Sequence, residues 1–585
     1  MCGIFALFNV GSTPSVPIGS SPYWDSHGKM LTDNVYPVNM PVELNNLYNA
    51  FMKGRGRGPE TSKLSTYQSV LLGFHRLAIN GLNPESDQPI CSGDIRLICN
   101  GEIYNYRELY AEMNISPRTG SDCEVIIHLY KKYGMEYTLS VLDGEFAFVL
   151  IDGDTAFVAR DPFGVRPLYT TFSESEQVHA PIFSSELKMI PQYYPVISTH
   201  FQPGTYSQFR FVSGVWSNVF HQTRYFTPGI SYIGKGERDD DEICGQLRAK
   251  FIRAVEKRCE CTERPVACLL SGGLDSSLVT SIVCDYRRRC GLPPVETYSI
   301  GLEGSEDLRY ARIVAEHLGT EHTEIVVSEQ DFLDAIPEVI RAIESYDTTT
   351  VRASIGNYLL GKYIAAHSRA KVILNGDGSD ELMGGYLYMR ACPDTLEYDR
   401  ETRRLLSEIH AFDVLRSDKS ISSHGLEPRT PFLDRDFVQY YLSIPAPMRR
   451  GGKIEKHWIR RAFDCRESRG EPYLPAEILW RRKEAFSDGV SHRKRSLYEI
   501  IQDYVVKMDY TYYTNDSSHP VSFRKLRVSK NPPDTLEQLY YRSIFVHWYP
   551  NTDILPHFWM PRYVDAKDAS ARTLAIYNDA EDQAE

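Results

Sequence analysis

The fold is decided by residues 269–277, which read LLSGGLDSS. They join residues 266–270, an apolar run that predicts a buried strand, to residues 274–289, whose apolar spacing predicts a helix. Backbone N–H groups in a glycine-rich turn at a helix N-terminus bind phosphates, and Asp275 can hold Mg²⁺ against them. We therefore predict a phosphate-binding loop here, and the alternative is a generic strand–helix turn.

Strands and helices continue to alternate after this loop. Apolar runs predict strands at residues 296–301, 322–327 and 371–374, and helical spacing predicts helices at 308–318, 331–345 and 354–367. Such alternation predicts an α/β parallel sheet with helices on both faces. A helix is also expected at residues 240–258, and the pattern becomes mainly helical after residue 394.

The N-terminal third of the chain has a different pattern. Short apolar runs separated by Gly, Asp and Asn predict strands at residues 3–8, 70–74, 95–99, 146–151 and 156–158. One helix is expected at residues 123–133, and residues 10–42, rich in Pro, Gly and Ser, are expected to form an irregular insertion. We therefore expect a first domain at residues 2–215, a linker at 216–239, a second domain at 240–550 and a tail at 551–585.

Bulk composition argues against several classes of protein. The formal net charge is -12 and the basic runs are short and scattered, which disfavours nucleic-acid binding. No run approaches the ~20 apolar residues of a transmembrane helix, and the N-terminus lacks a signal-peptide pattern. The 12 cysteines form no CxxC pair, so we expect most of them to be reduced core residues of a cytoplasmic (cytosolic) protein.

Cys2 is the exception among the cysteines. It becomes the first residue once Met1 is removed, and the apolar residues after it suit a buried strand. A thiol on the first residue has its own general base, because an α-amine that titrates near ~7.7–8.0 is partly neutral at working pH. Cys2 is therefore a candidate nucleophile, although on its own it reads more simply as an incidental second residue.

Further positions supply what the hydrolysis of glutamine needs. Arg76 follows a predicted strand, where it can pair with a carboxylate through two hydrogen bonds. Asn100 and Gly101 offer a side-chain amide and an unobstructed backbone N–H, the two components of an oxyanion hole. Asp122 offers a carboxylate for an ammonium group. Each alone has a simpler reading as a turn, since Asn-Gly is a common hairpin turn.

These residues lie in motifs that resemble a known family. About the first 210 residues resemble the N-terminal-nucleophile (class II) glutamine amidotransferase domain, in MCGIF, RGPE, HRLAI, NGEIYN, GSDCE, LDGEFAF and ARDPFGVRPLY. The resemblance implies an α+β sandwich of two β-sheets flanked by helices (αββα). It also implies that glutamine is bound by Arg76, Leu77, Ala78, Ile79, Asn80, Asn100, Gly101, Glu102 and Asp122. One departure is Glu60, where the family usually has aspartate.

The second domain carries its own candidate residues. Asp380 is a second candidate Mg²⁺ ligand, and residues 346–352, YDTTTVR, supply hydroxyls and a guanidinium for a substrate carboxylate. Lys483 can neutralise developing negative charge, although alone it reads as one more solvated basic residue. Residues 356–362 nearly match a Walker A loop, but Tyr363 stands where Ser or Thr is required, so we dismiss the match.

The second domain also resembles a known family. SGGLDSS resembles the loop of ATP pyrophosphatases, which implies an acyl-adenylate and pyrophosphate. With HGLEPRTPFLD and the terminal DASARTL, the motifs resemble B-type asparagine synthetases from end to end. The resemblance assigns ATP to Leu270, Ser271, Gly272, Gly273, Asp275, Ser276, Ile300, Asn375 and Gly376, aspartate to Thr349, Thr350 and Arg352, and Mg²⁺ to Asp275 and Asp380. The implied catalytic residues are Cys2, Asn100, Gly101, Asp377 and Lys483.

Three positions depart from the usual sequence of that family. Asn375 replaces a serine, and Asp377 replaces a glutamate. In the family, that glutamate accepts a proton during ammonia attack, and its side chain is one methylene longer than that of Asp377. Ala391 stands where the family has a lysine, with Arg390 beside it. We expect these changes to affect efficiency more than reaction class.

The resemblance implies glutamine-dependent synthesis of asparagine from aspartate and ATP, with AMP and pyrophosphate as further products. Ammonia released inside the protein escapes protonation, so an internal passage is expected. The alternatives are a related amide or lactam synthetase acting on another carboxylate, and a non-catalytic scaffold or regulator. The implied partners are glutamine, aspartate and ATP. The sequence does not determine the oligomeric state, for which we consider a homodimer.

Overall fold

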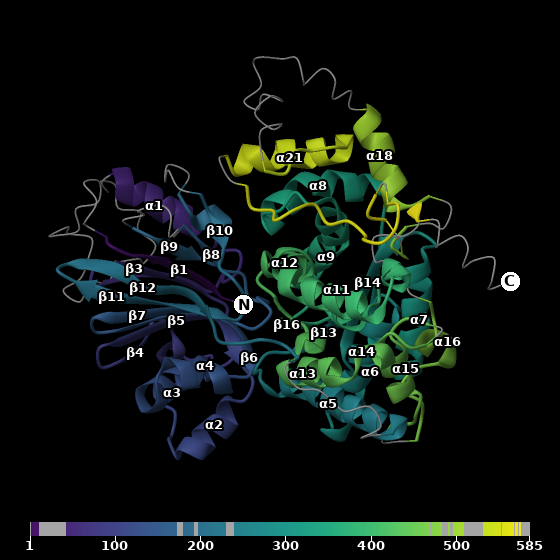
Figure 1. Ribbon diagram of the computed structural model, residues 1–585, viewed down its shortest axis with the longest axis horizontal. Helices are drawn as coiled ribbons and strands as arrows, with labels where there is room; N and C mark the ends of the chain where they lie inside the picture. The colour runs from purple at the N-terminus through teal and green to yellow at the C-terminus, as the bar shows by residue number, and fades with distance from the viewer. Residues whose placement is uncertain are drawn as a thin grey trace. The chain divides into compact units, whose positions relative to one another are not determined.

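The computed structural model describes residues 2–10, 42–171, 180–191, 197–229, 239–452, 454–467, 470–482, 489–491, 495–507, 530–550, 553–566, 568–570 and 573–574. The insertion expected at residues 10–42 lies almost entirely outside the described residues. The chain divides into two compact units (Figure 1). The first contains Met1–Thr227, Ser422–Leu426 and Trp548–Ile554, and the second contains Pro228–Ile421, Glu427–His547 and Leu555–Glu585.

The first unit contains two antiparallel six-stranded sheets. One has the order β10-β8-β9-β1-β3-β2, with β1 (Gly3–Leu7), β2 (Thr61–Tyr67), β3 (Val70–Arg76), β8 (Tyr169–Thr170), β9 (Ile182–Ser184) and β10 (Thr199–His200). The other has the order β12-β11-β7-β6-β5-β4, with β4 (Ile90–Ser92), β5 (Ile95–Ile103), β6 (Gly144–Asp152), β7 (Thr155–Arg160), β11 (Thr205–Val212) and β12 (Val215–Arg224). The flanking helices are α1 (Val42–Met52), α2 (Tyr106–Met113), α3 (Val125–Tyr133) and α4 (Met135–Val141). The five strands predicted for this region are confirmed.

Side-chain alternation explains why the two sheets pack face to face. Successive side chains of a strand point to opposite faces, and Ile4 of β1 joins Ile98 of β5 in one core between the sheets. Leu97 points the other way and packs in the core that includes residues of α2, α3 and α4. Phe51 of α1 packs on Phe5, on the outer face of the other sheet. The first unit is therefore the predicted αββα sandwich, with helices outside both sheets (Figure 1).

The second unit is built on a parallel sheet with the order β15-β14-β13-β16-β17. Its strands are β13 (Val266–Leu269), β14 (Glu296–Leu302), β15 (Glu321–Val327), β16 (Val372–Leu374) and β17 (Glu427–Arg429). The helices that alternate with them are α5 (Asp240–Glu260), α6 (Leu274–Arg289), α7 (Glu306–Leu318), α8 (Glu329–Ile343) and α9 (Thr348–His367). The predicted α/β architecture is therefore confirmed.

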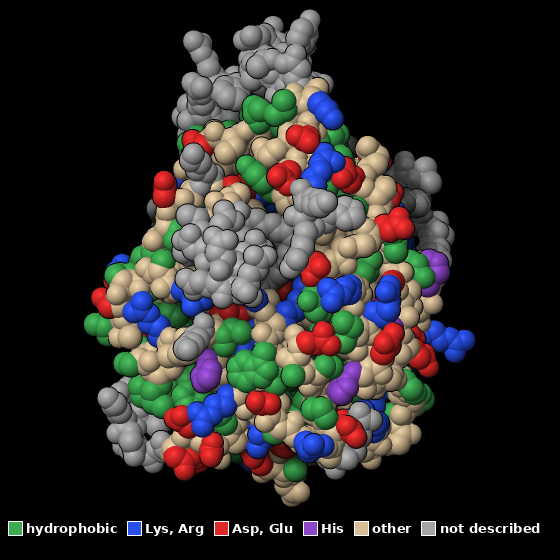
Figure 2. Space-filling model, turned by 90° about the vertical axis from the view of Figure 1, so that its right-hand side faces the viewer, with side chains coloured by type: hydrophobic (Ala, Val, Ile, Leu, Met, Phe, Trp, Pro, Cys, Tyr) green, Lys and Arg blue, Asp and Glu red, His purple; other side chains and the backbone are tan. Residues whose placement is uncertain are grey.

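The later part of the chain is mainly helical, as predicted. Its described helices are α10 (Ser379–Met383), α11 (Thr395–Glu408), α12 (Asp413–Ser422), α13 (Arg435–Ser443), α14 (Ala446–Arg449), α15 (His457–Phe463), α16 (Ala476–Leu479), α18 (Leu497–Lys507) and α21 (Leu536–Trp548). Among the described residues, no helix combines the length and apolarity needed to cross a membrane. On the face drawn in Figure 2, acidic and basic side chains are interspersed.

The sequence pattern missed the edge strand β17. Its three residues are Glu427, Pro428 and Arg429, so it lacks the apolar run that signals a buried strand. The two charged side chains satisfy each other, because Arg429 Nε donates to Glu427 Oε1 at 2.8 Å. A buried ion pair therefore lies opposite Val372 and Leu374 of the neighbouring strand β16.

The linker expected at residues 216–239 is corrected at its start. Val215–Arg224 forms β12 and pairs antiparallel with β11 across Ser213 and Gly214, which have φ of 54° and 87°. Positive φ at both central residues is typical of a two-residue type I′ hairpin. The polar and partly exposed side chains of β12 hid the strand, and residues 230–238 lie outside the described part of the chain.

Two candidate active sites

Cys2 lies at the start of β1, against the core between the two sheets of the first unit. Its thiol donates to the Leu77 carbonyl at 3.6 Å, and its own carbonyl accepts from Arg57 Nε at 3.0 Å. Arg57 also pairs with Glu186 at 2.8 Å. The RGPE motif therefore supplies a buried arginine that fixes the backbone of the candidate nucleophile.

His75 is near Cys2 in the sheet but points away from it. It pairs with Gly3 in the register of β1 and β3, so its side chain lies on the α1 side of the sheet. Its Nδ1 is 2.8 Å from the Ser62 hydroxyl and its Nε2 is 2.9 Å from the Phe51 carbonyl. Burial lowers the pKa of His75 to about 4. Both ring nitrogens are therefore hydrogen-bonded to the protein, and the imidazole ring is neutral near pH 7.

Arg76 ends β3 and is held by the loop that follows it. Its guanidinium donates to Asp87 at 2.5 Å, to the Gly81 carbonyl at 2.6 Å and to the Asn83 carbonyl at 3.0 Å. The next residues are fixed as well, because the Ala78 N–H donates to Glu60 Oε2 at 2.9 Å. Glu60, the departure in RGPE, therefore supports the backbone of the predicted glutamine-binding segment.

Asn100 and Gly101 continue strand β5 rather than forming the turn that each could make alone. The Asn100 amide is fully buried and donates to Ser185 Oγ at 3.4 Å, and Ser185 Oγ accepts from the Ile4 N–H at 3.0 Å. A Cβ on Gly101 would lie 2.2 Å from the Glu145 carbonyl oxygen. This end of β5 is therefore connected to β1, and only glycine fits at position 101.

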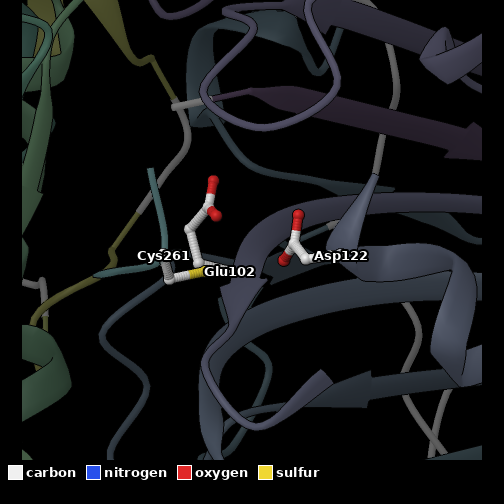
Figure 3. A group of neighbouring side chains, drawn as sticks. All are labelled: Glu102, Asp122 and Cys261. Carbon is white, nitrogen blue, oxygen red and sulfur yellow. The ribbon is translucent and has the colours of Figure 1, made fainter. Parts of the chain in front are cut away.

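Two buried carboxylates lie beside this end of β5. Asp122 begins a 3₁₀ turn before α3, and its Oδ2 accepts from the Ile103 N–H at 2.6 Å. Glu102 Oε2 accepts from Asn80 Nδ2 at 2.5 Å. Figure 3 labels both side chains. These contacts connect the segment after Arg76 with the predicted glutamine-binding residues of β5 and the turn.

The second unit contains a cavity of about 210 Å³ at the carboxyl ends of its parallel strands, where ligands of open α/β sheets bind. The predicted ATP-binding residues that line it are Leu270, Ser271, Gly273, Asp275, Ser276, Ile300, Asn375 and Gly376. Gly272 does not line it. Its φ of +71°, and the 2.4 Å that would separate a Cβ from the Ala311 N–H nitrogen, show that it lets the loop pack on α7.

Lys456 joins the two carboxylates that were expected to hold Mg²⁺. Its Nζ lies 2.7 Å from Asp275 Oδ2 and 2.6 Å from Asp380 Oδ1, and its side chain is buried. Asp275 Oδ1 also accepts from the Ser379 hydroxyl at 2.6 Å. The sequence did not indicate Lys456, because neither lysine of the run RRGGKIEK has a distinguishing pattern.

Asp377 lines the same cavity and pairs with α12. Arg416 donates to Asp377 Oδ1 at 2.9 Å and to Asp413 Oδ1 at 2.6 Å. The Tyr386 hydroxyl donates a hydrogen bond to Glu381. Burial, and to a lesser extent the negative charge of Asp413, raises the pKa of Glu381 well above its ordinary value. All five residues line the cavity. The sequence did not indicate Arg416 and Asp413, which lie in an ordinary helical pattern, or Tyr386, which lies in an aromatic turn.

The predicted aspartate-binding residues are separated by the structure. Thr349 lines the cavity. Thr350 does not: its hydroxyl and N–H donate to Asp347 Oδ2 at 2.8 and 2.9 Å. Arg352 also points elsewhere and pairs with Glu537 and Asp568. Of the three residues predicted to bind aspartate, Thr349 therefore lines the cavity and Thr350 and Arg352 do not. Lys483 lies outside the described residues.

Family models match both parts of the chain. The glutamine amidotransferase domain family matches residues 37–241, and the asparagine synthase family matches residues 246–401 and 390–529. The Gallus gallus asparagine synthetase (glutamine-hydrolyzing) is 39% identical over 553 residues, covering 90% of this chain and 96% of the relative. The Homo sapiens protein of the same name is 38% identical with the same coverage.

Among solved structures, the B. subtilis glutamine phosphoribosylpyrophosphate amidotransferase complexed with ADP and GMP covers 51% of this chain and 66% of its own. Its TM-score is 0.27 at 17% identity, too low to indicate a shared arrangement. Fold, cavity and family matches together define an amidotransferase-type ligase, in which a glutamine amidotransferase domain precedes an ATP-using synthetase domain. The chain belongs to the glutamine-hydrolysing asparagine synthetase family.

Proposed function

We propose that the two units divide the reaction of this family, glutamine-dependent asparagine synthesis. The first unit releases ammonia from glutamine at Cys2, and the second uses ATP to convert aspartate to β-aspartyl-AMP, which the ammonia attacks. The observation that carries the proposal is the coincidence of the family match with a cavity lined by eight of the nine predicted ATP-binding residues. Glutamine, aspartate and ATP are therefore the proposed substrates.

In the first unit, the Cys2 thiolate attacks the glutamine side-chain amide after its own α-amine has taken the thiol proton. The Gly101 N–H and the Asn100 amide stabilise the oxyanion, ammonia leaves, and water hydrolyses the thioester to glutamate. Arg76 and Asp122 bind the α-carboxylate and α-ammonium groups. The bonds that Arg76 makes to Asp87 and two carbonyls support this role, because they orient the guanidinium before the substrate arrives.

In the second unit, the phosphates of ATP lie along the loop that precedes α6. The aspartate β-carboxylate attacks the α-phosphorus and pyrophosphate leaves. Asp275 and Asp380 would hold Mg²⁺, because carboxylate oxygens are its preferred ligands and these two lie close enough together to share one cation, the Lys456 ammonium. A bound Mg²⁺ neutralises phosphate charge. Lys483 is proposed to stabilise the leaving pyrophosphate.

Amide formation releases a proton, because neutral ammonia becomes a neutral amide when AMP leaves as an anion. Asp377 lines the cavity and is the proposed proton acceptor. Its pair with Arg416 at 2.9 Å supports this role by holding the shorter carboxylate in one position. Thr349 is the proposed aspartate contact, since its hydroxyl is buried and has no hydrogen-bond partner among the described residues.

The proposal is tested by measuring AMP and pyrophosphate release against a panel of carboxylic amino acids with ATP and ammonium. Aspartate is expected to be the substrate. Release with a different acid would favour an amide or lactam synthetase, and no aspartate-dependent release would contradict the proposal.

All 12 cysteines are free, which supports a reducing compartment, and we propose the cytosol.

A further inference from the structure

Arg352 on α9 forms a buried cluster with the C-terminal part of the second unit. Its Nε and one terminal nitrogen donate to Glu537 at 2.8 and 2.5 Å. Both terminal nitrogens donate to Asp568, at 2.8 and 2.9 Å. The guanidinium also stacks over the Tyr498 ring at 4.8 Å. Four of its five N–H groups are therefore used by two carboxylates of the protein itself.

A second contact joins the same region to the start of α9. The Trp559 N–H donates to Asp347 Oδ1 at 2.8 Å. Asp347 is fully buried and is the N-cap of α9, since its other oxygen accepts from the Thr350 N–H. The Trp559 ring also packs on Tyr386, a residue of the cavity, with centroids 5.2 Å apart.

Thr349 lies between these two anchors. Asp347 precedes it by two residues and Arg352 follows it by three, so one turn of α9 is held on both sides. Within that turn, Thr349 is the residue that lines the cavity with a buried hydroxyl. The position of this hydroxyl therefore depends on residues 536–547 and the described part of 555–570, which we call the C-terminal segment.

We propose that the C-terminal segment is part of the aspartate site and that Arg352 is a positioning residue, which acts through Glu537 and Asp568 to place Thr349. Direct binding of a substrate carboxylate by Arg352 would require the displacement of two buried protein carboxylates. That exchange would leave Glu537, which is almost fully buried, without its bidentate partner. The inference rests on the proposed function only in taking aspartate as the acid bound in this cavity.

The test compares Glu537→Gln and Asp568→Asn with wild type by steady-state kinetics on the full chain. Each variant is expected to raise the aspartate KM about tenfold, while the ATP KM and the glutaminase kcat/KM stay within twofold. Asp568→Glu is expected to restore most of the affinity, because it keeps the charge. Glu324→Gln is the matched control: it breaks a bidentate arginine pair, with Arg312, on the surface of the same unit.

The two roles of Arg352 predict opposite results. If Arg352 binds aspartate directly, removing its competing carboxylates frees the guanidinium, and the aspartate KM falls or stays unchanged, which would overturn the proposal. Circular dichroism and thermal midpoints monitor the folding of each variant. Because Asp568 is partly accessible, Asp568→Asn provides the test if Glu537→Gln does not fold. If wild type acts on another acid, the proposed function fails, and the same KM comparison with that acid still tests the segment.

Discussion

The Lys456 ammonium lies 2.6 Å from the Asp380 carboxylate, and Asp275 is its second partner at 2.7 Å. It is therefore a buried cation at the point where the phosphates of ATP are expected. Lys456→Met removes this charge, and we expect ATP- and aspartate-dependent pyrophosphate release to fall by about 10²–10³-fold. Lys250→Met, which breaks an exposed pair with Asp436, is the control. Release within tenfold of wild type would show that Lys456 has no part in the chemistry.

Asp377 and Arg416 lie 2.9 Å apart, and the proposal gives Asp377 a role only after adenylation. Asp377→Asn is therefore expected to keep pyrophosphate release in the presence of aspartate and ATP. It should lower the rate of asparagine formation by about 10²-fold, which is the lower end of the rate contribution usual for a general base. Asp377→Glu, which restores the length usual in the family, is expected to retain activity. Equal loss of both products in Asp377→Asn would place Asp377 in the adenylation step instead.

His75 should affect the stability of the first unit rather than its chemistry. Its pKa is about 4 in the folded protein and 6.5 ordinarily, so its stabilising contribution is complete above pH 6.5 and is lost as pH falls through about 4. Each unit of pKa difference corresponds to about 1.4 kcal/mol. Urea denaturation at pH 7.5 and pH 4.5 is expected to show a smaller pH dependence in His75→Gln than in wild type.

The same His75→Gln variant tests the base assignment. At pH 7.5 we expect its glutaminase activity to stay within tenfold of wild type, because the imidazole faces α1 and is hydrogen-bonded to Ser62 and the Phe51 carbonyl. A loss above about 10³-fold with unchanged circular dichroism would identify His75 as the base. The α-amine of Cys2 would then lose its proposed role.

Gly101 has no room for a side chain. Gly101→Ala would place its Cβ 2.2 Å from the Glu145 carbonyl oxygen and 2.6 Å from Phe146 Cα, so backbone must move. We expect a loss of about 1–3 kcal/mol in the free energy of unfolding of the first unit, with loss of glutaminase activity. Gly245→Ala in α5 meets open space and is expected to raise stability by about 0.5–1 kcal/mol. Equal stability of the two variants would contradict the packing described here.

The sequence predicted the elements whose signals are local. LLSGGLDSS predicted the loop before α6, and short apolar runs predicted β1 and β5, because hydrophobic patterning and turn chemistry act over a few residues. The motifs also singled out Cys2, which directly precedes β1, Asn100 in β5, and Asp275 in the first turn of α6. These parts of the fold and of both sites could be predicted without coordinates.

Some contacts that the sequence did not indicate join residues far apart in the chain. Lys456 meets Asp275 across 181 residues, and Arg352 meets Glu537 across 185. Nothing in the sequence beside Arg352 distinguishes a guanidinium bound to substrate from one bound to protein carboxylates. The strand β17 was missed for a different reason: it has no apolar run, and its two charged residues, Glu427 and Arg429, pair with each other within the strand.

The most direct test of the central claim uses Cys2→Ala, assayed separately with glutamine and with an ammonium salt. We predict that glutamine-dependent asparagine formation disappears while the ammonium-dependent reaction continues at a rate close to wild type. Cys91→Ala, which removes an exposed thiol, should lose neither activity. Glutamine-dependent asparagine formation that persists in Cys2→Ala, or loss of both reactions in a folded variant, would contradict the division of labour between a terminal thiol and a separate nucleotide cavity.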